Sequence, residues 1–185
     1  MRTKIDPRLF SLIRPTLAQT GVDYAIGGAV AMSFAGYTRQ TEDLDVFFKH
    51  TDRPVVLRAL RAAGVVFATI AEPYQYAIIP SAKHPDRRVD LLFTSIDFEL
   101  DAVEYPDVVQ VSAGRAKANI NVFPAVLLKT AKVVSDREKD HDDVRRMNDR
   151  GLIDPAEIVK SLRHYKEPRG ALRLTLILGG KNPDA

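Results

Sequence analysis

Short apolar runs rich in Val, Ile, Phe and Tyr recur along this chain and predict the strands of a sheet. They lie at residues 22–26, 44–49, 65–70, 74–79 and 88–93, with weaker candidates at 108–112 and 118–122. Successive side chains of a strand point to opposite faces of its sheet. Leu44 and Val46 should therefore face the core, while Asp43 and Asp45 share the opposite face.

A second pattern, with apolar residues three and four positions apart, predicts helices. These cover residues 7–20, 29–35, 53–63, 123–134 and 155–165. Asp154 followed by Pro155 suits an N-cap and the first helical position. Ser135 and Glu138 have the spacing of a capping box, which predicts that another helix begins there. The segment 172–178 is apolar but too short to assign.

The predicted strands come before residue 123 and helices follow it. This order predicts an α+β fold, with a mixed sheet flanked by helices and a helical C-terminal part. We expect residues 1–122 to form the core and residues 123–185 to pack on it as one compact unit.

Composition narrows the class of protein. The chain has 185 residues, 45% of them hydrophobic, and a formal net charge of +3, which permits an anionic partner without requiring one. It has no Cys, which excludes disulfides and thiolate metal sites. No apolar run reaches transmembrane length and the N-terminus does not read as a signal peptide, so we expect a cytoplasmic protein without a membrane partner.

Three aspartates are the first candidates for chemistry. Asp43 and Asp45 lie on one face of a strand, where like charges raise each other's pKa unless a cation lies between them. Asp90 is a charge in an almost wholly apolar strand and would join them if the two strands are neighbours. Such hard oxygen ligands suit Mg²⁺. The alternatives are a polar sheet edge for the first pair and a local ion pair with Arg87 or Arg88 for Asp90.

Gly27 and Gly28 lie where a predicted strand passes to a predicted helix. Without side chains, their backbone N–H groups can approach an anion, and the helix dipole favours negative charge there. A tight turn would require the same residues. Arg39 and Thr41, between the glycines and the acids, could add contacts to phosphate.

These features together resemble a known superfamily. Gly-Gly, fourteen intervening residues, Asp-Leu-Asp and a later apolar strand with a third Asp are similar to the polymerase-β-type nucleotidyltransferases. Within them, GGAVAMSFAGYTRQTEDLD most resembles the small bacterial abortive-infection (AbiEii-like) proteins of toxin–antitoxin type. LKTA at 128–131 and REKDHDD at 137–143 resemble later motifs, so the likeness covers about residues 22–150.

The resemblance implies a nucleotidyltransferase-like fold and a role for each matching position. These positions are Gly27 and Gly28 for nucleotide phosphates, Asp43 and Asp45 for metal, Asp90 as the third acid and Lys129 for the triphosphate. Many members of the superfamily have Ser after the first Gly. Because this chain has Gly28 there, we expect the phosphate contact to come from the backbone.

Helical geometry allows a separate test of the later motifs. At about 100° per residue, Lys129 falls at the border of the apolar face and could enter a cleft, whereas Lys132 points further outward. Asp140 and Asp143 share a face with apolar residues and need partners. Lys129, Arg137 or a nucleotide-bound ion could serve, and acids early in a helix also complement its dipole.

The resulting hypothesis is a metal-dependent nucleotidyltransferase. An acceptor hydroxyl or phosphate attacks the α-phosphate of an NTP, such as ATP, and pyrophosphate leaves. Asp43 and Asp45 would bind two Mg²⁺ ions, and Asp90 would bind the metal nearer the nucleophile and help take the proton of that nucleophile. Lys129 and Arg39 would neutralise phosphate charge. The acceptor could be an RNA end, a partner protein or a small-molecule hydroxyl. The alternative is a non-catalytic nucleotide-binding or partner-binding component of a toxin–antitoxin-type system.

Overall fold

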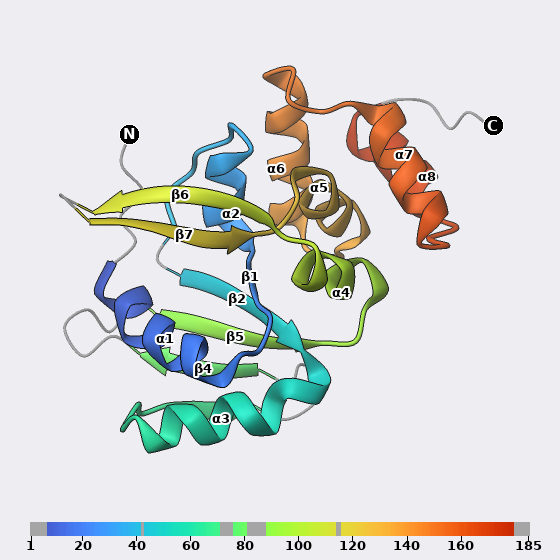
Figure 1. Ribbon diagram of the computed structural model, residues 1–185. Coiled ribbons are helices and arrows are strands. Elements are labelled where there is room, and N and C mark those ends of the chain that lie inside the picture. Colours follow the sequence, from blue (N-terminus) through green and yellow to red (C-terminus); the bar gives the residue numbers. More distant parts are fainter. Residues whose placement is uncertain (1–6, 42, 71–75, 81–87, 114–115, 180–185) are drawn as a thin grey trace.

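One mixed sheet organises the computed structural model (Figure 1), which describes residues 7–41, 43–70, 76–80, 88–113 and 116–179. Its strands, in chain order, are β1 Ala25–Ile26, β2 Asp43–Lys49, β3 Ala68–Ile70, β4 Tyr76–Pro80, β5 Arg88–Thr94, β6 Asp107–Ala113 and β7 Ala116–Val122. They are ordered β3-β4-β5-β2-β1-β7-β6 across the sheet. The pairs β2–β5 and β1–β7 are parallel, and the other neighbouring pairs are antiparallel.

The helices surround this sheet. They are α1 Pro7–Thr20, α2 Gly28–Phe34, α3 Arg53–Ala62, α4 Asp97–Glu104, α5 Ala125–Val134, α6 Glu138–Asp149, α7 Pro155–His164 and α8 Gly170–Ile177. α1 and α3 pack side by side, well away from the C-terminal helices α6, α7 and α8 (Figure 1). α5 contacts α2, α4, α6, α7 and α8, so it lies inside a layer of other helices. The predicted α+β class is therefore confirmed.

The differences from the predicted elements are local. α4 had not been predicted, and the unassigned apolar segment at 172–178 lies largely in α8. The strand expected over 22–26 is confined to β1, and the one expected over 65–70 is confined to β3. Among the described residues, no helix is both long and apolar enough to cross a membrane.

The alternation in β2 is confirmed. Leu44, Val46 and Phe48 are 2%, 0% and 0% exposed, respectively, and belong to the hydrophobic core. Asp45 is half-buried on the opposite face. Because α2 packs on that second face, the acids of β2 lie beside a helix start rather than at a bare edge of the sheet.

The predicted capping box at Ser135 and Glu138 is wrong. α6 does begin at Glu138, but its N-cap is Arg137, which makes no side-chain capping bond. The Ser135 hydroxyl accepts a bond from the Arg137 N–H and donates to Asp140, 2.7 Å away. Glu138 pairs instead with Arg145, Oε1 to Nη1 at 2.9 Å. The Ser135 hydroxyl therefore bonds to the buried carboxylate of Asp140 instead of capping the helix. The capping-box pattern does not predict this bond.

Candidate functional site

Strand register brings the three predicted aspartates together. β2 and β5 are adjacent and parallel, with Asp45 directly opposite Asp90. Asp43 lies two residues before Asp45 and therefore faces the same side of the sheet. We call Asp43, Asp45 and Asp90 the carboxylate cluster. The sequence-based condition for a cluster, that the two strands be neighbours, is confirmed.

Arg88 is the cation that contacts this cluster from within the sheet. Its Nε lies 2.9 Å from Asp90 Oδ1 and 3.6 Å from Asp43 Oδ1. The predicted alternative of a local ion pair for Asp90 is thus also realised. Within the described ranges, no three acidic or histidine side chains form a ready-made metal site.

Negative charge in the cluster is only partly neutralised. Burial and, after it, the charges of Asp90 and Asp43 together raise the pKa of Asp45 to about 6, against the smaller opposing effect of the cations Arg137 and Lys139. Burial also raises the pKa of Asp90, although the hydrogen bond and charge of Arg88 oppose this shift. Like charges held together favour binding of a cation or a proton.

Gly27 and Gly28 are required by their close approach to β2. The Gly27 N–H donates to the Asp45 carbonyl at 2.9 Å, and a Cβ on Gly27 would lie 2.5 Å from the Phe47 ring. Gly28 has φ +57°, and a Cβ there would lie 1.7 Å from Asp45 Oδ2. A serine at this position would displace the carboxylate. The glycines therefore place the start of α2 directly against Asp45.

The other predicted nucleotide-binding residues, Arg39, Thr41 and Lys129, have three different kinds of surroundings. Arg39 Nε lies 3.3 Å from Asp143 Oδ2. The Thr41 hydroxyl donates to the Asp43 carbonyl at 3.2 Å, so Thr41 shapes the turn that precedes the cluster. Lys129 is half-buried on α5, and the structure records no ion pair for it within the described residues.

The prediction that Lys132 points outward is wrong. Its Nζ lies 2.7 Å from Asp140 Oδ1 and 2.8 Å from Asp143 Oδ2, and the residue is 5% exposed. An outward-pointing Lys132 requires that α5 have a solvent-exposed face opposite its apolar face. Because other helices enclose α5, Lys132 points into a helix interface, where the two aspartates of α6 meet it.

Two cations near the cluster were not assigned to it from the sequence. Arg137 and Lys139, at the start of α6, both lower the pKa of Asp45, and Lys139 also lowers that of Asp90. Basic residues at a helix N-terminus oppose the helix dipole. The same helix start also carries Glu138 and Asp140, so its local composition does not reveal that it faces an anionic site.

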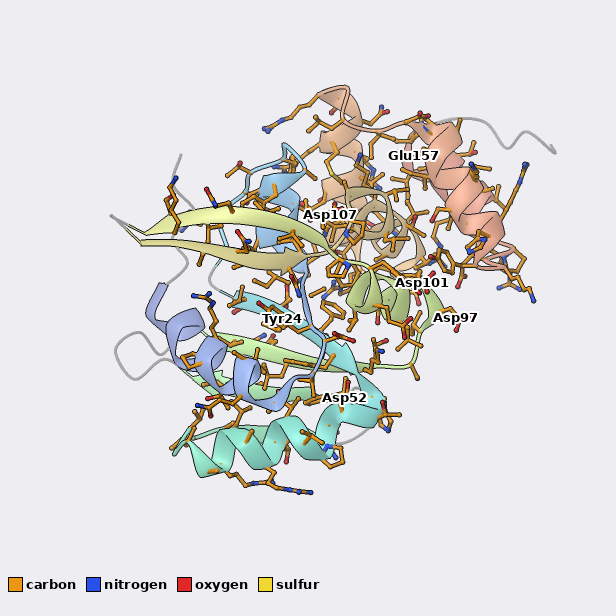
Figure 2. The ribbon with its side chains drawn as sticks, viewed as in Figure 1. Tyr24, Asp52, Asp97, Asp101, Asp107 and Glu157 are labelled. Atoms are coloured by element: carbon orange, nitrogen blue, oxygen red, sulfur yellow. The ribbon has the colours of Figure 1, made fainter. Side chains whose placement is uncertain are left out.

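A separate acidic groove lies at the other end of β5. It is lined by Asp97, Leu100, Asp101, Glu104, His164 and Tyr165. Figure 2 labels Asp97 and Asp101 on α4, and the Tyr165 hydroxyl donates to Asp101 Oδ2 at 2.6 Å. α4 follows the C-terminal end of β5, whereas Asp90 lies near its beginning. The groove is therefore not part of the carboxylate cluster.

Comparisons with known proteins bear on the fold and the family of this chain. A solution structure of the antibiotic-resistance factor ANT(2'')-Ia is similar over 93% of this chain and 88% of that chain, with 16% identity and a TM-score of 0.50. A nucleotidyltransferase-like protein from Paracoccidioides brasiliensis is similar over 95% of this chain and 92% of that chain, with 16% identity and a TM-score of 0.51. No curated protein matches in sequence. These likenesses confirm the nucleotidyltransferase-like fold.

The family model named aminoglycoside-2''-adenylyltransferase matches residues 10–133, about two thirds of the chain. This range contains α2, β2, β5 and the whole carboxylate cluster. The expected enzyme class, a nucleotidyltransferase, is confirmed: the chain belongs to the aminoglycoside-2''-adenylyltransferase family.

Proposed function

We propose that this protein transfers AMP from ATP to a hydroxyl of an aminoglycoside-like small molecule and releases pyrophosphate. The family name supports both the nucleotide and the class of acceptor. The observation that carries the proposal for this chain is the register of Asp45 opposite Asp90, on the same face as Asp43. An isolated Asp-x-Asp would not provide the third carboxylate.

The carboxylate cluster would hold Mg²⁺, and we propose two ions. Its donors are hard oxygens, and burial together with the charges of Asp90 and Asp43 raises the pKa of Asp45 to about 6, which supports a site that favours a bound cation. Bound Mg²⁺ would supply charge stabilisation for the attacking and leaving oxygens. Arg88 would exchange its contacts with Asp43 and Asp90 for contacts with solvent or phosphate.

The reaction requires a proton acceptor. As the acceptor oxygen attacks the α-phosphorus, the bond from that phosphorus to the oxygen bridging to the β-phosphate breaks, and pyrophosphate leaves with the bonding electrons. The proton of the acceptor hydroxyl passes to Asp90. The Asp90 side chain is 13% exposed, and the raised pKa of its carboxylate makes it a better base than a solvated one.

Phosphate binding is assigned to the start of α2 and to nearby cations. Because Gly27 and Gly28 have no side chains, a phosphate could approach the first backbone N–H groups of α2 beside Asp45, while the Gly27 N–H itself bonds to the Asp45 carbonyl. Lys139, whose charge acts on the cluster, and Lys129, which the resemblance to the superfamily implies, would neutralise phosphate charge. Thr41 would hold Asp43 in place through its backbone.

Labelled ATP with an aminoglycoside that carries a free 2''-hydroxyl tests this proposal. We expect label in a small-molecule product when Mg²⁺ is present. Asp43→Asn and Asp45→Asn should each lower turnover by about a thousandfold, or about 4 kcal/mol of transition-state stabilisation. Asp142→Asn is the matched control because Asp142 is exposed on α6 and pairs with Arg145. Label found in RNA or in protein would show that the acceptor is an RNA end or a partner protein and not a small molecule. Absence of any transfer would favour the non-catalytic toxin–antitoxin-type role.

A further inference from the structure

A buried group of charges lies between α5 and α6. Lys132 is 5% exposed, Asp140 1% and Asp143 5%, and the lysine bonds to both aspartates. One cation against two anions leaves a net negative charge in a place where unpaired charge is costly. This group, Lys132, Asp140 and Asp143, therefore needs further positive charge at its border.

Two arginines from different segments supply that charge. Arg137 Nε lies 2.6 Å from Asp140 Oδ2, and Arg39 Nε lies 3.3 Å from Asp143 Oδ2. Asp140 Oδ2 also accepts from the Ser135 hydroxyl at 2.7 Å. Each aspartate thus faces Lys132 on one side and an arginine on the other.

Both arginines remain accessible, and both border the same buried charges. The Arg137 side chain is 66% exposed and that of Arg39 is 34% exposed. The charge of Arg137 lowers the pKa of Asp45. Arg39 lies in the segment that joins α2 to β2, between Gly28 and Asp43. Arg137 bonds to Asp140 through Nε, whereas Arg39 Nε only lies near Asp143 without a hydrogen bond and Arg39 Nη1 donates to the Gln40 carbonyl at 3.3 Å. A guanidinium has five N–H donors, so both arginines keep donors for an anion.

We infer that Lys132, Asp140 and Asp143 form a positioning triad that holds Arg39 and Arg137 as a two-arginine clamp for the nucleotide phosphates. The inference rests on the proposed function, because it assigns the clamp to the same nucleotide. Side chains fixed before binding lose less conformational entropy when they contact a ligand. The triad itself does not touch the nucleotide and acts through the two arginines.

Nucleotide binding without acceptor tests the clamp, by calorimetric titration of ATP with Mg²⁺. Arg39→Gln and Arg137→Gln should each raise the Kd of ATP about tenfold, as expected for loss of one charge-assisted hydrogen bond. Both positions are partly exposed, so these variants test the clamp even if a change in the triad prevents folding. Asp142→Asn should leave the Kd unchanged.

A double-mutant cycle distinguishes positioning from a purely structural role. Asp140→Asn alone should raise the Kd of ATP about tenfold, whereas in the Arg137→Gln background it should change the Kd less than about twofold. An equal effect of Asp140→Asn in both backgrounds would overturn the inference. Wild-type-like ATP affinity in both arginine variants would also overturn it while leaving AMP transfer intact. Failure of the wild-type protein to bind ATP would instead overturn the proposed function and the clamp with it.

Discussion

The carboxylate cluster and the positioning triad place the same chemical group in opposite electrostatic settings. In the cluster, burial and neighbouring acids raise the pKa of Asp45 to about 6. In the triad, burial alone would raise the pKa of Asp140, but bonds from Lys132 and Ser135 and the nearby Arg137 charge lower it. Buried acids with matched cations hold a structure together, whereas buried acids left unmatched store electrostatic energy that a bound cation can release.

The largest expected effect is a loss of stability on substitution of Lys132, compared with Lys129 on the same helix. Lys132→Met should lower the free energy of unfolding by about 3–5 kcal/mol, because it leaves two buried carboxylates without their shared cation. Chemical denaturation followed by circular dichroism measures this loss. Lys129→Met is the matched control, since Lys129 has no ion pair in the described part of the chain, and it should cost less than about 1 kcal/mol. Equal losses in the two variants would contradict the comparison.

A smaller effect of the opposite sign is expected in the cluster. The pKa of Asp45, about 6 in the folded state, exceeds its unfolded value, so the native state binds more protons between these two pKa values. Stability therefore falls as pH rises through about 4 to 6, and the ionised group is unfavourable above that range. Asp45→Asn should raise the free energy of unfolding at pH 8 by about 1–3 kcal/mol, with no gain below pH 4.

The free energy of unfolding of Asp140→Asn should depend on pH in the opposite direction to that of Asp45→Asn. The lowered pKa of Asp140 means that its ionised form stabilises the native state above the unfolded pKa and stops doing so as pH falls through the folded one. Asp140→Asn should therefore destabilise the protein at pH 8 and progressively less in acid. Stability changes of the same sign in Asp45→Asn and Asp140→Asn at pH 8 would remove the distinction between the two groups.

The smallest expected effect concerns the exchangeable cation of the cluster. Arg88→Gln should tighten Mn²⁺ binding about two- to fivefold, because Arg88 forms partly exposed ion pairs with Asp43 and Asp90 that would compete with a bound cation. Electron paramagnetic resonance of free Mn²⁺ measures this change without turnover. Arg58→Gln, on the exposed side of α3, is the control. Weaker binding in Arg88→Gln would show that Arg88 supports the site instead of competing for it.

Local patterns were sufficient for most of the predicted strands and for the facing of Asp43 and Asp45, because alternation depends only on the backbone of one strand. They were insufficient for Ser135 and Lys132. The partners of both residues lie on α6, and local residue spacing does not reveal how α6 packs against α5. The same limit explains why Arg137 and Lys139 were not assigned to the cluster.

The sequence by itself determined the α+β class, the Gly27-Gly28 turn and three acids of the right type at suitable positions along the chain. Tertiary structure decided that Asp90 lies opposite Asp45, that Gly28 has no room for a side chain, and that α6 presents cations to the cluster. The physical reason is that strand order and helix packing depend on burying apolar surface across the whole chain. Charges are then brought together by elements that are distant in sequence.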